Sequence, residues 1–503
     1  MRRWIKWTVI VVSAGMTLML AFGAFIAYSF LTAKVDTVGK VDFDRELAVP
    51  PLEEGTVDEQ GRRVFDLTMQ RGETDLGRDE PTPTWGINGS YLGPTLRAER
   101  GEEVLVNVTN DVGEPSTLHW HGMHLPAEMD GGPHQMFDDG ETWSPTWRVD
   151  QPAATLWYHP HPHGETAKHV YRGLAGMFIL DDEEEAALPL PREYGVDDVP
   201  VILQDKEFDG SELDTTHGFF ESNGILGDTM LVNGTPGPYL DVTTERIRLR
   251  LLNASNARVY NLHFSDDREY DVIATDGGLL PEPVRRDHLL LSPGERAEVV
   301  VSFEPGETVV LRSDEQDAGS RFTGASDRLD ILQLRAADRL ERSPEVPDHL
   351  ADPPDLDRDD VEKTREFELQ GTVINGKDMD MERIDETVEL DATELWRVRN
   401  TDGQPHNFHV HDVQFAIVSV DGSPPPAELA GRKDTVFLPE QSEVELLVRF
   451  TDYADPDSPY MYHCHLLRHE DAGMMGQFVV VEPGDEAGEV SGDHAGHHSG
   501  HHD

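Results

Sequence analysis

The segment that decides the fold reads Val104-Leu-Val-Asn-Val-Thr-Asn110, with counterparts in Ile247-Arg-Leu-Arg-Leu-Leu-Asn253 and Glu394-Leu-Trp-Arg-Val-Arg-Asn400. Apolar and polar residues largely alternate in these segments, as they do in strands with one buried face. An Asn-Gly pair precedes each segment, at intervals of 145 and 142 residues, and begins at Asn88, Asn233 and Asn375. A His follows nine or ten residues after each segment, at His119, His263 and His409. This order of elements, found three times, predicts three copies of one β-domain.

Each copy is expected to be a β-sandwich or β-barrel, because Gly, Pro and Asp separate the alternating stretches and helical periodicity is scarce. A charged stretch with four prolines lies between the second and third copies and predicts a surface linker. The last residues are mostly Gly, acids and His, which predicts a disordered tail.

The composition limits the partners of the protein. The 503 residues include 97 Asp and Glu against 42 Lys and Arg, which gives a formal net charge of -55. Such a charge repels phosphate backbones, so we expect no nucleic acid partner. Only 8 of the basic residues are Lys, a bias that fits a high-salt habitat or simply an acidic surface, and both interpretations stay open.

The N-terminus predicts export and a membrane helix. Arg2, Arg3 and Lys6 precede 27 uncharged residues from Trp7 to Ala33, and a bilayer needs about 20. Positive charges on the N-terminal side place the body outside the cytoplasm. We therefore expect an extracytoplasmic protein anchored by residues 7–33; the alternative is a cleaved export signal of the twin-arginine type.

Histidines occur in pairs that suit metal binding. Residues at i and i+2 on a strand point to one face, so a His-x-His pair presents two imidazoles together. The chain has four such pairs: His119/His121, His159/His161, His409/His411 and His463/His465. Histidines with only a structural role, in the core or on the surface, would not be expected to form four such pairs. Two of these pairs lie toward each end of the chain. The second copy has Ser265 where the other copies have the second His of a pair. Only the first and third copies therefore have the paired histidines that suit metal binding.

The single cysteine indicates which metal is bound. Cys464 lies between His463 and His465, with His469 and Met474 close by in the sequence. A thiolate, two His and a weak axial Met form the blue-copper electron-transfer set. A single thiol is usually a buried structural residue, but these neighbours favour a metal ligand. Because Cys464 flanks two paired histidines, one backbone segment would connect an electron-entry site to the histidine cluster.

At these motifs the sequence resembles the multicopper oxidases, a family with three cupredoxin domains. The resemblance runs from about residue 60 to 483 and is closest to the bacterial copper-efflux oxidases and laccases. It rests on His119-Trp-His121, His159-Pro-His161, His406-Asn-Phe-His-Val-His411 and His463-Cys-His-Leu-Leu-Arg-His-Glu-Asp-Ala-Gly-Met474.

The resemblance implies four copper ions and assigns their ligands. The type 1 copper would be held by His406, Cys464, His469 and Met474. The type 2 copper would be held by His119 and His409. One type 3 copper would be held by His121, His159 and His465, and the other by His161, His411 and His463. His163 follows the second pair and is expected to support the ligands from behind.

Two acids are similar to the family's proton-handling residues. Asp130 occupies the position of a carboxylate near the trinuclear cluster, and Glu470 directly follows a type 1 ligand. Both would supply protons during reduction of dioxygen to water. In a chain with 97 acids, surface charge is the competing interpretation for either residue.

The expected fold is therefore all-β, with three cupredoxin-like Greek-key β-barrel domains after one N-terminal transmembrane helix. In chain order the expected segments are the anchor and linker at 1–40, domain 1 at 41–185, domain 2 without copper ligands at 186–338, a linker at 339–362, domain 3 at 363–483 and the tail at 484–503.

The reducing substrate is left open between two classes. A laccase-like oxidase of phenols or aromatic amines is favoured, because the stretch 336–363 contains no Met, whereas the copper-efflux oxidases have a Met-rich insertion. A cuprous oxidase in copper tolerance is the alternative. It is supported by Asp402, which stands four residues before His406, where the resemblance implies an acid that binds substrate copper. Met379 and Met381 on an expected strand support it less, because such a pair is more often a packing feature. A non-enzymatic cell-division scaffold is a remote third possibility, against which the complete ligand set counts. We expect a monomer.

Overall fold

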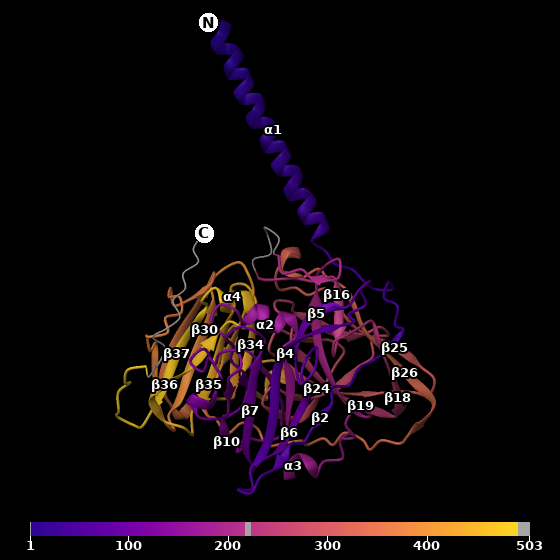
Figure 1. The fold of residues 1–503 in the computed structure, drawn as a ribbon, viewed down its shortest axis with the longest axis vertical. Coiled ribbons are helices and arrows are strands. Elements are labelled where there is room, and N and C mark those ends of the chain that lie inside the picture. The colour runs from indigo at the N-terminus through magenta and orange to yellow at the C-terminus, as the bar shows by residue number, and fades with distance from the viewer. Residues whose placement is uncertain (1, 217–222, 491–503) are drawn as a thin grey trace.

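The computed structural model describes residues 2–216 and 223–490, and three β-sandwiches make up its body (Figure 1). The first sandwich packs two sheets on each other. One contains β3 (Thr56–Val57), β4 (Arg63–Thr74), β5 (Thr82–Ile87), β7 (Glu103–Asp111), β9 (Thr142–Trp143) and β10 (Thr146–Arg148). The other contains β2 (Leu52–Glu53), β6 (Thr95–Glu99), β8 (His119–His121), β11 (Ala154–His159) and β12 (Gly176–Asp181).

The second sandwich is the largest of the three and also takes in the chain just after the N-terminal helix. Its first sheet contains β1 (Arg45–Glu46), β18 (Pro238–Thr244), β20 (Tyr260–Phe264), β23 (Leu289–Leu291), β25 (Thr308–Ser313) and β26 (Leu329–Glu341). Its second sheet contains β13 (Asp198–Lys206), β16 (Thr229–Val232), β17 (Thr235–Pro236), β19 (Arg246–Asn253), β21 (Tyr270–Thr275), β22 (Gly278–Arg286) and β24 (Arg296–Ser302). A small ribbon joins β14 (Phe208–Asp209) to β15 (Glu212–Leu213).

The third sandwich repeats this plan. One sheet contains β27 (Val361–Gln370), β28 (Val373–Ile374), β30 (Thr393–Asn400), β32 (Phe415–Val420), β33 (Arg432–Lys433) and β35 (Glu443–Arg449). The other contains β29 (Glu386–Glu389), β31 (His406–Val410), β34 (Thr435–Leu438), β36 (Asp455–His463) and β37 (Met475–Val481). A separate buried apolar cluster fills each sandwich, so each has its own core.

The three repeat segments predicted from the sequence are β7, β19 and β30, and each pairs in parallel with the first long strand of its own sandwich, β4, β13 or β27. The Asn of each Asn-Gly pair has a positive φ, between 51° and 56°. Its side chain bonds to that first strand in all three copies: Asn88 Oδ1 accepts from Thr68 N, Asn233 Oδ1 from Ile202 N and Asn375 Oδ1 from Glu368 N. The repeat therefore marks a turn in which the Asn side chain accepts a hydrogen bond from the backbone of that strand.

The Asn that ends each repeat strand also has one function in all three copies. Its Oδ1 accepts from the backbone N–H two residues later, and its Nδ2 donates to carbonyl oxygens of the loops that follow. In the third copy this turn leads from Asn400 through Asp402 to His406. The repeated asparagines thus fix the loops that lead to His119, His263 and His409.

Few helices accompany the strands. They are α1 (Arg2–Thr32), α2 (Thr166–Arg172), α3 (Glu183–Ala186) and α4 (Leu467–Asp471), with 3-10 turns at Ala127–Met129, Arg321–Thr323, Arg358–Asp360 and Ala427–Leu429. Helix α1 projects from one end of the body (Figure 1). Its segment Ile10–Phe30 has a mean hydropathy of 2.2 and is unburied, which suits a membrane span or an export signal.

The linker docks on the second sandwich through Leu350, which is buried in a cluster with Ile273 and Val300. Most of the predicted disordered tail, from residue 491, lies outside the described residues.

We expect Gly131→Ala to destabilise the protein by about 3 kcal/mol or more, because a side chain at this residue would collide with backbone. Gly131 has a φ of +75°, and a Cβ there would lie 1.8 Å from the carbonyl oxygen of Leu118. Gly140 is a matched control, since its φ is +83° but a Cβ would meet nothing within 4 Å. Gly140→Ala should cost about 1 kcal/mol, the strain of the left-handed backbone alone. Denaturant unfolding measures both variants, and equal losses would contradict the expected clash.

Candidate metal centre

Eight buried histidines meet between the first and third sandwiches. Strand register creates their pairing, since His119 on β8 lies opposite His159 on β11, and His409 on β31 lies opposite His463 on β36. The second member of each pair follows two residues later on the same face. All eight side chains are at most 1% exposed: His119, His121, His159, His161, His409, His411, His463 and His465. The structure thus brings together all four predicted pairs.

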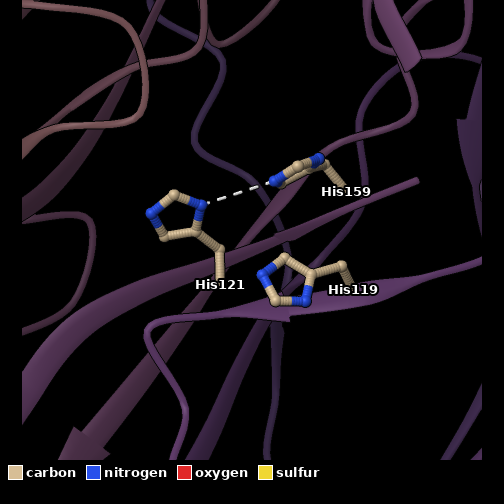
Figure 2. A group of neighbouring side chains, drawn as sticks. All are labelled: His119, His121 and His159. Carbon is tan, nitrogen blue, oxygen red and sulfur yellow. Dashed lines mark hydrogen bonds between the residues drawn. The ribbon is translucent and has the colours of Figure 1, made fainter. Parts of the chain in front are cut away.

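The ring nitrogens point toward shared spaces between the imidazoles. Figure 2 shows His119 and His121 side by side with His159 facing them, and His121 Nδ1 lies 3.4 Å from His159 Nε2. On the other side of the cluster, His463 Nε2 lies 3.2 Å from both His161 Nε2 and His411 Nε2. Rings from the two sandwiches also stack, with centroids 3.9 Å apart for His119 and His411 and 3.7 Å apart for His121 and His409.

Burial favours neutral imidazole in this cluster, and several of its ring nitrogens have no hydrogen-bond partner. Burial, reinforced by neighbouring imidazoles, lowers the pKa of His159, His161, His411 and His463 well below the usual 6.5. Neutral rings with converging nitrogens repel through their lone pairs unless a cation lies between them. The Nε2 atoms of His119 and His409 are buried without a hydrogen-bond partner. This donor set fits metal ions, and neutral imidazole is the form that binds copper.

Three buried acidic side chains lie against the outer nitrogens of this cluster, and each approaches two rings. Asp130 Oδ2 lies 2.7 Å from His411 Nδ1, and the Asp130 carbonyl oxygen lies 2.9 Å from His119 Nδ1. Glu470 lies 3.4 Å from His161 Nδ1 and 3.3 Å from His463 Nδ1. The structure thus places both predicted acids at the cluster, where surface charge is no longer an explanation for them.

Asp434 is the third carboxylate, and sequence reasoning missed it. Its Oδ1 lies 3.1 Å from His121 Nε2, and its carbonyl oxygen lies 2.9 Å from His409 Nδ1. A proton on His121 Nε2 leaves the Nδ1 lone pair directed at His159, so Asp434 selects the tautomer that can bind metal. Asp434 follows Arg432 and Lys433 in a segment that has no histidine, so no sequence signal pointed to it.

The second sandwich supports this carboxylate. Arg296 forms a bidentate pair with Asp434, with Nη1 2.7 Å from Oδ1 and Nη2 2.6 Å from Oδ2. Both side chains are fully buried. Arg296 holds the pKa of Asp434 well below its usual range despite burial, which raises it. A permanently charged Asp434 remains an acceptor for His121.

A second candidate centre surrounds Cys464. His406 Nδ1 and His469 Nδ1 lie 3.1 Å apart and 3.7 Å and 3.6 Å from the sulfur. Met474 is fully buried in the same core cluster, and its backbone bonds to both Cys464 and His469. Burial alone would raise the pKa of Cys464, but hydrogen bonds to the two histidines lower it to about 6. A thiolate beside two imidazole Nδ1 atoms is the arrangement that blue-copper chemistry needs.

Two other residues of the Cys464 centre control access to it and its link to the cluster. Asp402 Oδ2 lies 3.0 Å from His406 Nε2 and forms the partly exposed rim of the centre. Burial raises the pKa of Asp402, but the His406 bond and backbone N–H groups lower it to about 2. Asn407 Oδ1 accepts from the Cys464 thiol and from His465 N. Asn407 was not predicted, although its place between two ligand positions was a signal.

Two predictions about peripheral residues are wrong. His163 is exposed and does not pack behind the ligands. Met379 and Met381 lie in a loop, because Gln477 Nε2 donates to the carbonyl oxygens of Asp380 and Met381 and bends the chain away from strand geometry. Met379 N donates to Gly473 O, which places this loop beside Met474.

Comparison with known proteins agrees with this geometry. Family models described as multicopper oxidase match residues 68–185 and 346–484. A multicopper oxidase of Staphylococcus haemolyticus is 36% identical over 445 residues, which cover 86% of this chain and 92% of that protein. The chain belongs to the multicopper oxidases. It is also 39% identical to the cell division protein FtsP of Dickeya dadantii over 466 residues, covering 89% of this chain and 94% of that one.

Solved structures confirm the cupredoxin-like fold predicted from the sequence. A laccase from Pediococcus acidilactici superposes with a TM-score of 0.81 at 37% identity and covers 88% of this chain and 95% of its own. A laccase-like multicopper oxidase from Ochrobactrum superposes with a TM-score of 0.80 at 36% identity, covering 86% of this chain and all of its own. The protein is therefore an oxidoreductase of a copper-binding family, as predicted.

We expect Asp434→Asn to lower copper affinity by about 10–100-fold, the usual effect of losing a partner that orients a ligand. The amide can present its NH₂ to His121 and so favour the wrong tautomer. Asp330→Asn is a matched control, because Asp330 is also buried and pairs with Arg312 but lies away from the histidines. Copper per chain after dialysis against a graded chelator measures the difference. Equal retention by both variants would contradict an orienting role.

Proposed function

We propose that the protein is a membrane-anchored, extracytoplasmic, laccase-like multicopper oxidase. It couples one-electron oxidation of phenols or aromatic amines to reduction of dioxygen to water. The observation that carries this proposal is the convergence of ten histidines, Cys464 and Met474 into two adjacent buried centres. A scaffold without redox chemistry has no use for so many neutral, mutually repelling imidazoles in its interior. The similarity to the cell division protein therefore extends to the fold, and the site supports an enzyme.

Four copper ions fit the two centres. The type 1 ion would be held by His406, Cys464, His469 and Met474. The type 2 ion would be held by His119 and His409. The two type 3 ions would be held by His121, His159 and His465, and by His161, His411 and His463. Bound copper supplies the one-electron redox chemistry and the site of oxygen reduction, while the protein supplies geometry and protons. Cys464 is covalently continuous with His463 and His465, so a single backbone segment joins the two centres.

Asp130 and Glu470 are suited to deliver the four protons that reduction of dioxygen to two waters consumes. Burial, reinforced by Asp471, raises the pKa of Glu470 well above its usual range. A carboxylic acid that stays protonated at neutral pH can donate its proton where water is excluded. Asp130 and Glu470 contact opposite pairs of rings, so protons would reach the cluster from two sides.

The nature of the electron donor follows from the rim of the Cys464 centre. The exposed side of Asp402 could receive the hydroxyl or amino group of an aromatic donor, and the two structural neighbours compared above are described as a laccase and as laccase-like. Cuprous ion is the second candidate. It is supported by the charge of Asp402 together with the Met379 loop beside Met474. Soft thioethers suit Cu(I), whereas a lone carboxylate also suits a phenol.

Oxygen uptake by the copper-loaded chain distinguishes these donors. We expect uptake with a phenolic substrate to exceed uptake with Cu(I) offered side by side, in both low and high salt. Faster uptake with Cu(I) would place the protein among cuprous oxidases. No uptake with either donor, from protein shown to hold its copper, would overturn the enzyme proposal.

We expect Glu470→Gln to lower the oxygen-reduction rate by about 10²-fold, within the range for loss of a general acid. The amide preserves shape but has no acidic proton. Reduction of the blue centre under anaerobic conditions should be unchanged, because Glu470 contacts His161 and His463 of the cluster and is not a ligand of Cys464's centre. Glu185→Gln is the control for a buried acid that pairs with Arg248 in place of the cluster histidines. Stopped-flow reduction and oxygen uptake separate the two steps, and equal loss in both would contradict the assignment.

A further inference from the structure

The point where the chain would leave a bilayer is tied to one place on the body. Val35 N donates to Asp327 Oδ1 at 2.8 Å, and Thr37 N donates to Arg328 O at 2.9 Å. Gly39 N continues this attachment by donating to Asp330 Oδ2 at 2.7 Å. Since α1 ends at Thr32, only two residues, or at most about 10 Å of extended chain, separate the helix from the hydrogen bond of Val35. The body cannot drift far from the membrane surface.

The Cys464 centre lies close to this attachment. Asp327, which holds Val35, also pairs with the buried Arg258. Asn256 lies two residues before Arg258 in the same loop, and its carbonyl oxygen accepts from Leu467 N at 2.9 Å. Leu467 is the first residue of α4, and His469 follows two residues later. One short loop of the second sandwich is therefore in contact with the anchor attachment on one side and with the ligand-bearing helix on the other.

The positions of the helices in the molecule agree with these contacts. Helices α4 and α2 lie at the end of the body from which α1 departs, whereas α3 lies at the opposite end (Figure 1). The loop that carries Asp402 belongs to the same region, because Pro405 O accepts from Asn223 Nδ2 at 3.4 Å. The next residue, Gly224, is so close to Ala257 and Arg468 that a Cβ there would lie 3.1 Å and 3.6 Å from their Cβ atoms. The rim of the Cys464 centre therefore lies toward the end of the molecule from which α1 departs.

The junction itself has the residues expected at a bilayer surface. The Arg321 guanidinium lies 4.7 Å from the centroid of the Phe30 ring, and Phe322 meets the same ring edge-on at 6.0 Å. Lys34 follows directly after the apolar helix and pairs with Glu315. Aromatic and basic side chains gather at membrane interfaces, so this junction suits a body held at the headgroups.

We propose that the electron donor is held in the bilayer and is an isoprenoid quinol, an uncharged aromatic diol. This inference rests on the proposed function, since a quinol is a phenol that the same centre would oxidise. A net charge of -55 disfavours soluble anionic donors, while a neutral lipid-borne donor reaches the rim at the high local concentration that tethering provides. Two quinols each lose two electrons, one at a time, and two protons to become quinones. The four electrons and four protons convert one dioxygen to two waters.

The test uses the full chain, loaded with copper and reconstituted in phosphatidylcholine vesicles. Oxygen uptake is measured with ubiquinol in the bilayer and with water-soluble hydroquinone. An insertion of about 20 Gly and Ser residues after Ala33 adds a flexible tether with an r.m.s. length of about 25 Å, which releases the rim from the surface. The matched control carries the same insertion after Val490, in the C-terminal segment beyond the last strand.

We expect the insertion after Ala33 to lower ubiquinol-driven uptake about 10-fold while hydroquinone-driven uptake stays unchanged. The insertion after Val490 should alter neither rate. Two outcomes would overturn the membrane-donor inference and leave the proposed oxidase intact. One is oxygen uptake with hydroquinone but not with ubiquinol, and the other is ubiquinol-driven uptake that the insertion after Ala33 does not change. Loss of residues 1–33 from the mature protein, seen by intact mass, would overturn it as well. No uptake with either donor would overturn the proposed oxidase itself.

Discussion

Eight imidazoles buried without compensating charge are the constraint on which the rest of the structure depends. Each ring must stay neutral, and each must have its proton on the nitrogen that faces away from the shared space. Much of this requirement is met by acceptors placed outside the cluster, which are Asp130, Asp434 and backbone carbonyl oxygens. Glu470 lies 3.4 Å and 3.3 Å from two further outer nitrogens. Because the first sandwich supplies Asp130 and the third supplies the other two acids, the cluster forms correctly only when both sandwiches are docked.

This constraint gives a structural role to the second sandwich, which has no paired histidines. The second sandwich supplies Arg296, and a charged group was needed there because Asp434 is fully buried and would otherwise protonate. Asp276 extends the network, since its carboxylate accepts from Arg296 N and from Lys433 Nζ. A buried set of alternating charges costs desolvation energy, and its value here is the fixed orientation of one carboxylate rather than net stability.

Residues adjacent in sequence could be predicted, and residues brought together by docking could not. The Asn-Gly turns and the His-x-His pairs are local features whose geometry follows from strand period and turn chemistry, so the repeated fold and the ligand positions were predictable. Arg296 and Asp434 are 138 residues apart and belong to different sandwiches, and neither has a pattern around it. The strand expected around Met379 failed for a similar reason, since a distant side chain, Gln477, determines that loop.

One short segment of the second sandwich positions both candidate centres. Ser292 and Pro293 accept from Asn407 Nδ2, and Asn407 Oδ1 in turn accepts from the Cys464 thiol and His465 N. Three residues after Pro293, Arg296 holds Asp434 and through it His121. The five consecutive residues 292–296 therefore position both the electron-entry centre and the histidine cluster. A small shift of this segment would disturb both centres together, which makes their relative placement, and with it the path between them, a property of the sandwich that carries no ligand.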